Sequence, residues 1–232
     1  MLQLMALLSE ESKVLSMKAI VFVDVQKDFV KGGKLAFGYP AEDNLQKIVD
    51  YAKECVDAYC NDPTTLIKIY ATRDTHEKTT YKDIGTIINF DTYGRVDNTE
   101  QINGDPISGY LATLEGQKLP VEHCVEGTDG WQIVDPLMEV LLGKATFVNK
   151  PTFGSYDLAD IVAEDVEGTL DEIVICGYDL SICVLANAVL LRAKYPNTKI
   201  VVRADLCGDV DEESYKAALK VLQMQQIEVE SH

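Results

Sequence analysis

Short apolar runs alternate with amphipathic segments along most of this chain. The run at 18–24 (KAIVFVD) is continuous, rich in β-branched residues and ends abruptly in polar positions, which is typical of a strand buried on both faces. Apolar residues then recur at helical spacing over 45–59 and predict an amphipathic helix. The same two patterns predict further strands at 66–72, 145–149, 172–177, 199–204 and 227–230, and further helices at 131–142, 156–166, 181–194 and 211–225.

This alternation predicts the fold class. Strands that alternate with helices pair in parallel, and the helices then cover both faces of the sheet. We therefore expect an α/β protein, a three-layer α/β/α sandwich with a mostly parallel central sheet. We interpret residues 1–16 as an N-terminal extension and 17–232 as one domain. A long segment at about 73–130 shows little periodicity, and such a stretch inside a compact domain is usually functional.

Charge and composition limit the kinds of partner that this protein is expected to bind. The 232 residues carry 38 acidic and 21 basic side chains, a net charge of −17, and such an acidic surface repels the phosphates of a nucleic acid. No apolar run approaches the ~20 residues that span a bilayer, so we expect no membrane contact either. The six cysteines form no CxxC pair, and the N-terminal segment lacks the features of a secretion signal, which favours a cytoplasmic location.

Chemically active side chains follow several of the predicted strands. Asp24 ends the first strand, Asp74 follows the second, Lys150 the third, and Cys183 lies beyond the fourth. In a parallel sheet the carboxyl ends of the strands meet at one edge, where ligands bind. Each residue alone has a simpler explanation as a turn residue, a solvated lysine or a buried thiol. All four at one edge favour an active site.

Cys183 is the candidate nucleophile among the six cysteines. A free thiol with a pKa near ~8.5 is only a few per cent ionised at pH 7. The N-terminus of the predicted helix 181–194 and the Lys150 ammonium would both lower that pKa, so we expect a reactive thiolate. We interpret four other cysteines as packing residues and leave Cys124 open as a supporting group; the four are Cys55, Cys60, Cys176 and Cys207.

A metal site is a second possibility in the long segment. Asp74 and His76 are two residues apart, so an extended chain points both to one side. His123 is the other histidine of this segment, and one Asp with two His suits a catalytic divalent ion. Hydrogen-bonded loop histidines without a metal are the alternative.

Five blocks of this sequence resemble the isochorismatase-like cysteine hydrolases, and within that superfamily the nicotinamidases and related amidases. The resemblance extends from Met17 to about Gln225, and the blocks occur in the family's order. They are VFVDVQKDFVKGGKL at 21–35, ATRDTH at 71–76, LPVEHCVEGTDGW at 119–131, NKPTFGS at 149–155 and CGYDLSICV at 176–184.

The resemblance implies a catalytic triad of Asp24, Lys150 and Cys183. It also implies a cis peptide bond at Tyr178–Asp179, followed by an oxyanion hole made of the backbone N–H groups of Asp179 and Cys183. Asp28 lies in the first block but beyond the strand end, and we expect it to be structural.

For the metal, the resemblance implies Asp74, His76 and His123 as ligands of a divalent ion. Zinc is expected first, with manganese or iron as alternatives. A further histidine of many relatives has no counterpart here, and Glu115, eight residues before His123, would substitute for it. An apolar wall for a flat substrate ring is expected from three aromatic residues, although each is equally compatible with plain core: Phe29, Tyr156 and Tyr178.

The implied activity is hydrolysis of a small-molecule amide, nicotinamide to nicotinate and ammonia, through a thioester on Cys183. Isochorismatases proper act on a vinyl ether and generally lack this cysteine, so Cys183 argues against that activity. The alternatives are a metal-independent amidase for N-carbamoyl or ureido substrates, which would leave Asp74 and His76 without a metal, and a non-catalytic binding protein on the same fold. Relatives commonly assemble, so a homo-oligomer is expected.

Overall fold

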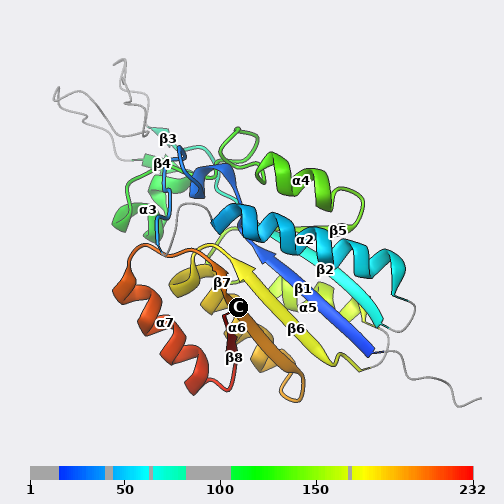
Figure 1. Ribbon diagram of the computed structural model, residues 1–232. Helices are drawn as coiled ribbons and strands as arrows, with labels where there is room; N and C mark the ends of the chain where they lie inside the picture. Colours follow the sequence, from blue (N-terminus) through cyan, green and yellow to red (C-terminus); the bar gives the residue numbers. More distant parts are fainter. Residues whose placement is uncertain (1–15, 40–43, 63–64, 82–105, 167–168, 232) are drawn as a thin grey trace, which may run out of the picture.

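A central sheet of six strands organises the protein, seen in a computed structural model that describes residues 16–39, 44–62, 65–81, 106–166 and 169–231 (Figure 1). The strand order is β5-β2-β1-β6-β7-β8, and every pairing in this sheet is parallel. The strands are β1 Ser16–Val23, β2 Thr65–Asp74, β5 Ala145–Lys150, β6 Glu172–Gly177, β7 Lys199–Cys207 and β8 Glu228–Glu230.

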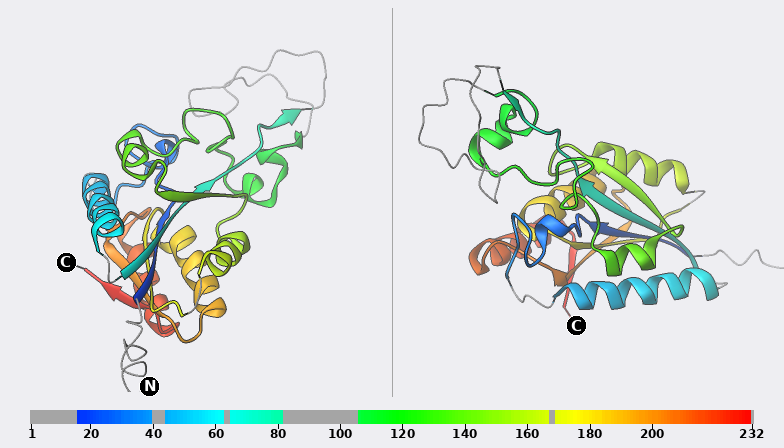
Figure 2. Two further views of the ribbon diagram at one scale, coloured as in Figure 1. Left: turned by 90° about the vertical axis from the view of Figure 1, so that its right-hand side faces the viewer. Right: turned by 90° about the horizontal axis from the view of Figure 1, so that it is seen from above.

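Helices cover both faces of the sheet. Helices α2 (Asn44–Asn61) and α4 (Asp135–Leu141) pack against each other on one face. Helices α5 (Tyr156–Asp165) and α6 (Leu185–Lys194) lie on the opposite face, where α7 (Glu212–Met224) contacts α6 (Figure 2). This arrangement confirms the predicted three-layer α/β/α sandwich. Among the described helices, none combines the length and apolarity that a bilayer span requires.

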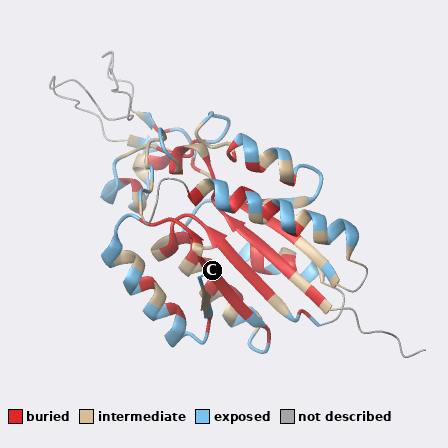
Figure 3. Cartoon of the chain, in the orientation of Figure 1, coloured by how far each residue is buried: buried red, intermediate tan, exposed pale blue. Residues whose placement is uncertain are grey.

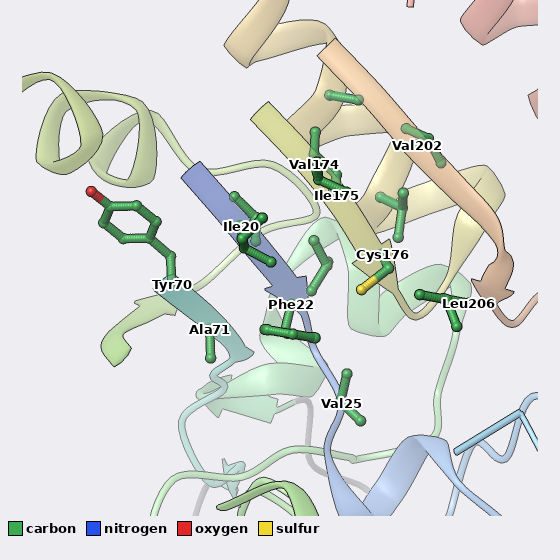
Figure 4. Packing of buried hydrophobic residues seen from close by; sticks show 14 of the residues in the cluster. Ile20, Phe22, Val25, Tyr70, Ala71, Val174, Ile175, Cys176, Val202 and Leu206 are labelled. Carbon is green, nitrogen blue, oxygen red and sulfur yellow. The ribbon is translucent and has the colours of Figure 1, made fainter. Parts of the chain in front are cut away.

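The continuous apolar runs are explained by the position of their strands. Strand β1 lies between β2 and β6, and its residues from Ala19 to Val23 are almost fully buried. Burial is concentrated along the central strands (Figure 3). Phe22 of β1 and Ile175 of β6 lie in this packed layer, as does Cys176, whose thiol is therefore a packing group (Figure 4).

Some element boundaries differ from the sequence prediction. The helix predicted at 131–142 begins only at Asp135, because Pro136 suits the first helical turn and Ile133 instead forms an isolated β-bridge with Gln26. The helix predicted at 181–194 starts as a wide π-helical turn, Leu180–Val184, before α6. Ser16 belongs to β1, so the sheet begins one residue inside the predicted extension; residues 1–15 lie outside the described residues.

The long segment at 73–130 contains short regular elements where it is described. Strands β3 (Thr80–Tyr81) and β4 (Pro106–Ser108) pair antiparallel, and α3 (Leu114–Lys118) follows them. These elements extend beyond the carboxyl edge of the main sheet (Figure 2). Residues 82–105 lie outside the described residues.

Candidate active site

The strand register brings the predicted chemistry to one edge. Asp74, the last residue of β2, pairs with Lys150, the last residue of β5. Asp24 follows β1 directly and has a positive φ of 50°. Thr72 of β2 secures it: the Asp24 N–H donates to the Thr72 Oγ1 (3.1 Å), and the Thr72 hydroxyl donates to the Asp24 Oδ1 (2.7 Å). The Asp24 side chain therefore turns back over the neighbouring strand.

Lys150 joins the three residues of the predicted triad. Its Nζ lies 2.6 Å from the Asp24 Oδ2 and 3.4 Å from the Cys183 Sγ. The Lys150 ammonium also donates to the Thr152 carbonyl oxygen at 3.1 Å, and the side chains of Lys150 and Asp24 are fully buried. An acid and a thiol from distant parts of the sequence thus both contact the same buried cation.

The electrostatics of this triad differ from the sequence expectation for the thiol. Burial raises the pKa of Cys183 well above its usual value; Lys150 opposes that rise, and Asp24 and Asp74 add to it. Burial also raises the pKa of Asp24, even beside Lys150. These shifts favour a neutral thiol at the candidate nucleophile Cys183, next to a carboxylate with increased proton affinity, over a free thiolate.

Cys183 lies in the π-helical turn that follows β6. Gly177 ends that strand with a φ of 126°, and a Cβ there would lie 2.1 Å from the Val23 carbonyl oxygen, so only glycine fits. One residue further on, the Tyr178–Asp179 peptide bond is cis, as the resemblance implied. The predicted oxyanion donors, the N–H groups of Asp179 and Cys183, stand at the two ends of the short segment that follows this bond.

Two hydrogen bonds of this turn are made by the neighbours of Cys183 and not by its own N–H. The carbonyl oxygen of Asp179 accepts from the N–H groups of Ile182 (3.3 Å) and Val184 (2.9 Å), the residues on either side of Cys183. The Cys183 carbonyl is occupied separately, because it accepts from the Asn187 side chain at 2.8 Å. In this wide turn the Cys183 N–H therefore takes no part in the two hydrogen bonds to the Asp179 carbonyl oxygen.

Four side chains form a group suited to a metal ion. Asp74, His76, Glu115 and His123 each offer one ligand atom, and these atoms all lie within 4.8 Å of one another. The Asp74 Oδ2 is 2.9 Å from the His76 Nε2 and 3.3 Å from the His123 Nε2. The His123 Nδ1 lies 2.7 Å from the Val121 carbonyl oxygen and donates to it, which leaves the His123 Nε2 lone pair for a ligand bond.

The donor set fits a divalent cation. Two carboxylates and two imidazoles are ligands that zinc, manganese and iron accept. Burial alone would raise the pKa of Asp74, but Lys150, His123 and His76 reverse this and lower it, so Asp74 is ionised. Asp74 also links the two clusters, since its Oδ1 is 3.5 Å from the Lys150 Nζ. The possible metal group thus adjoins the triad.

Gln26 is a supporting residue that sequence reasoning missed. Its Nε2 donates to the carbonyl oxygens of Asp74 (2.8 Å) and Trp131 (2.9 Å), and its Oε1 accepts from the Asp74 N–H (2.8 Å). Asp28 has the structural role expected of it, because its Oδ2 accepts from the Cys124 N–H at 2.8 Å. Both residues follow β1 in the VDVQKDF block, but nothing in the sequence indicates these long-range partners.

A cavity of about 270 Å³ opens beside the thiol. Cys183 and Asp179 line one part of it, and Asp74, Glu115 and His123 line another, so the nucleophile and the possible metal group face the same space. Most of the remaining wall is apolar. Its side chains are Phe29, Leu35, Phe37, Leu119, Phe153, Ile182 and Val210.

Of the three residues predicted to form an aromatic wall, Phe29 lines the cavity, and the prediction needs correction for the two tyrosines, which do not. Tyr156 is 77% exposed on α5 and lines a shallow surface depression instead. Tyr178 is buried, and its ring lies against Phe37, with ring centroids 6.4 Å apart, at a different depression. Phe37 and Phe153 are the other aromatic residues of the cavity. The direction in which a helix or loop points each side chain depends on the folded backbone, and a sequence motif does not reveal it.

Comparisons with known proteins agree with this architecture. The structure is similar to a zinc complex of Pyrococcus horikoshii pyrazinamidase, at 19% identity and a TM-score of 0.62 over 93% of this chain and 99% of that one. It is also similar to a Streptococcus mutans pyrazinamidase/nicotinamidase, at 22% identity and a TM-score of 0.64 over 92% of this chain and 99% of that one. A third similar structure is yeast nicotinamidase bound to nicotinaldehyde, at 18% identity and a TM-score of 0.63 over 93% of this chain and 100% of that one.

At these identities the structural similarity establishes a common fold. No curated protein matches this chain. The sequence itself matches the Isochorismatase domain over residues 18–232, and this match covers the sheet, the triad and the possible metal group. The chain therefore belongs to the isochorismatase family.

Proposed function

We propose that this protein is a cysteine-dependent amidohydrolase that acts as nicotinamidases do. The observation that carries the proposal is the position of Lys150, whose Nζ contacts both the Asp24 Oδ2 (2.6 Å) and the Cys183 Sγ (3.4 Å) beside the cavity. A thiol with a carboxylate base and a fixed cation is the arrangement that nucleophilic catalysis requires. The fold shared with nicotinamidases and pyrazinamidases supports it.

In the first half-reaction the carboxamide is converted to a thioester. Asp24 takes the proton of Cys183 while the sulfur attacks the carbonyl carbon, and Lys150 balances the negative charge on this pair. The N–H groups of Asp179 and Cys183 stabilise the oxyanion, each donor contributing about 3–4 kcal/mol. The carbon–nitrogen bond then breaks, and Asp24 returns the proton to the departing ammonia.

In the second half-reaction water attacks the thioester carbonyl carbon. Asp24 accepts a proton from that water, and the carbon–sulfur bond breaks to release the carboxylic acid product. The sulfur recovers a proton through Asp24, so the enzyme returns to its neutral-thiol state. The raised pKa of Asp24 suits it to accept and return a proton repeatedly.

Asp74, His76, Glu115 and His123 would hold a divalent ion at one side of the cavity. Such an ion supplies a positive charge and an open coordination position for a ring nitrogen or a water molecule. Zinc is the proposed ion, because the donor set suits it and the similar Pyrococcus horikoshii structure was solved with zinc.

The charges around the cavity favour an uncharged substrate. Asp74 and Glu115 are acidic, and the side chains that line the cavity in the described part of the chain include no Lys or Arg. Lys150 is already paired with Asp24. Apart from such a divalent ion, the carboxylate of an anionic N-carbamoyl substrate would meet no cationic side chain among those that line the cavity, so a neutral aromatic carboxamide fits better.

Ammonia release from a panel of amides tests the proposed function. With zinc or manganese added, we expect turnover of nicotinamide and pyrazinamide, and kcat/KM at least about 100-fold lower for N-carbamoyl amino acids, a difference of ~2.7 kcal/mol. A neutral ureido compound of similar size serves as control for charge. Preference for the anionic compounds would contradict the substrate assignment, and no hydrolysis of any amide would contradict the amidase itself.

Metal removal gives a separate expected result. Dialysis against a chelator should remove about one divalent ion per chain, as measured by elemental analysis, because the donor atoms converge on one position. The same treatment should lower nicotinamide turnover by orders of magnitude. Glu115→Gln, which keeps the size of the side chain, should lower the metal content in the same assay. Full activity in metal-free protein would contradict this part of the proposal. Homo-oligomer formation and a cytoplasmic location stay predictions.

A further inference from the structure

A second pair of acidic side chains lies beside the nucleophile turn, and the mechanism above does not use it. Asp179 and Asp209 are 2% and 0% exposed. Ser181 bridges them: its hydroxyl oxygen lies 3.0 Å from the Oδ1 atoms of both aspartates, and its N–H donates to the Asp179 Oδ1 (2.8 Å) and the Asp209 Oδ2 (3.0 Å). Ser181 therefore holds both carboxyl groups against the same hydroxyl and the same N–H.

The partners of the four carboxyl oxygens are not equivalent. Both oxygens of Asp209 accept from backbone N–H groups, Oδ1 from Val210 (2.7 Å) and Oδ2 from Ser181 (3.0 Å). The Asp179 Oδ1 accepts from the N–H groups of Ser181 (2.8 Å) and Ile182 (3.1 Å). The Asp179 Oδ2 is buried, and no donor reaches it from the described residues.

The charge balance of the pair requires a proton. In the described part of the chain, neither carboxyl group has a lysine or arginine among its hydrogen-bond partners. Two ionised carboxylates that are buried and bridged by one hydroxyl group repel each other strongly, so one of them retains its proton. The Asp179 Oδ2 is the one oxygen of the four that no N–H occupies, and it is therefore the atom that can carry that proton.

We propose that Asp179 and Asp209 share a single proton, held on the Asp179 Oδ2, and that this neutral acid–carboxylate pair positions the turn that carries Cys183. Asp209 and Ser181 are positioning residues in this proposal, since they act through Asp179. The Leu180 N–H donates to the Gly208 carbonyl oxygen at 2.8 Å, so the same junction ties the turn to the end of β7.

The surroundings of the pair agree with this protonation. Burial, with the neighbouring Asp209, raises the pKa of Asp179 to about 7. Cys207 of β7 and Tyr215 of α7 are two titratable groups that interact with the pair. On the cavity side, Asp179 shares the lining with Cys183, Asp74, Glu115 and His123. Burial raises the pKa of Cys207 above its usual value and that of Tyr215 to about 12, so both are neutral wherever Asp179 titrates.

Loss of the proton would disturb the oxyanion hole directly. The Asp179 carbonyl holds the N–H groups of Ile182 and Val184 around Cys183, and its own N–H is a proposed oxyanion donor. A negative charge on Asp179, the second of the pair, would repel both Asp209 and the oxyanion of the reaction. The nucleophile turn should therefore work best while Asp179 is neutral.

Thermal unfolding as a function of pH tests the pair without reference to activity. Folded Asp179 keeps a proton that unfolded Asp179 loses near pH 4, so wild-type stability should fall between about pH 4 and 7. Asp179→Asn mimics the neutral acid at every pH. Its Tm relative to wild type should therefore rise by about 5 °C between pH 5 and pH 8.

Two further variants locate the proton. Asp209→Asn should lower the Tm at every pH, because its NH₂ group would face the N–H of Ser181 or of Val210. Asp211→Asn is the control, an exposed aspartate of the same loop that caps α7 through the Ser214 N–H (2.8 Å); its effect should be small and independent of pH above 5. A pH-independent difference for Asp179→Asn, failure of that variant to fold, or equal effects of the two buried Asn variants would overturn the proposal.

The activity measurement rests on the proposed function and is kept separate. In wild type, kcat for amide hydrolysis should fall with a midpoint near pH 7, and this fall should be absent in Asp179→Asn. If that fall persists in the variant, the pair does not position the turn. If no amide is hydrolysed, the proposed function fails while the unfolding comparison still decides the protonation of the pair.

Discussion

Replacing Lys150 by methionine is expected to destabilise the protein by about 3–5 kcal/mol and to abolish amide hydrolysis. The Lys150 side chain is fully buried between Asp24 (2.6 Å) and Asp74 (3.5 Å). Without the ammonium, the buried Asp24 carboxylate would have no cationic partner among the described residues, Asp74 would keep only its histidine neighbours, and the Cys183 thiol would lose an adjacent positive charge. Urea unfolding measures the first effect and ammonia release the second.

A double variant separates buried charge from lost packing. Adding Asp24→Asn to Lys150→Met should recover about 1–3 kcal/mol of stability, because the unpaired carboxylate is then removed as well, while activity stays absent. Lys194→Met is the control, since its exposed pair with Asp160 (2.7 Å) should contribute no more than about 1 kcal/mol. Equal stability of the Lys150 and Lys194 variants would show that the buried ion pair contributes no more to the free energy of unfolding than the exposed one.

Cys183→Ala is expected to lower amide turnover by at least about 10⁴-fold, since no other group can form the thioester. Its stability should change by about 1 kcal/mol, because only one small buried atom is lost. Ammonia release and thermal unfolding measure the two effects on the same preparation.

Cys55→Ala is the matched control for this variant. Both cysteines are 6% exposed, but Cys55 lies on α2 and does not line the cavity. Its stability should fall by a similar amount while its turnover stays within about twofold of wild type. Substantial turnover by the Cys183 variant, or an equal loss in the two variants, would remove Cys183 from the nucleophile role.

The state of the thiol shows where reasoning from local sequence was insufficient. A helix start and a nearby lysine predict a lowered pKa for Cys183, and both features are present. Burial together with Asp24 and Asp74 outweighs them and raises the pKa. Desolvation depends on everything packed around an atom, and the sequence near Cys183 does not report it.

The order of strands and helices was predictable because it depends on local periodicity. A strand buried on both faces must be apolar throughout, as residues Ala19 to Val23 are, and a surface helix must be apolar along one face, as α2 is. The position of Asp24, Asp74 and Lys150 at one edge followed as well, because the carboxyl ends of parallel strands meet there. Family motifs then supplied the roles of these residues.

Only the tertiary structure decided which side chains share a space. Phe37, Phe153 and Val210 come from separate loops and line the cavity, whereas Tyr156 points to solvent and Tyr178 into the core. Asp179 and Asp209 are 30 positions apart and share Ser181 as a partner only because β6 and β7 are neighbours in the sheet. Such contacts depend on the geometry of loops and on burial, which a chain acquires only when it folds.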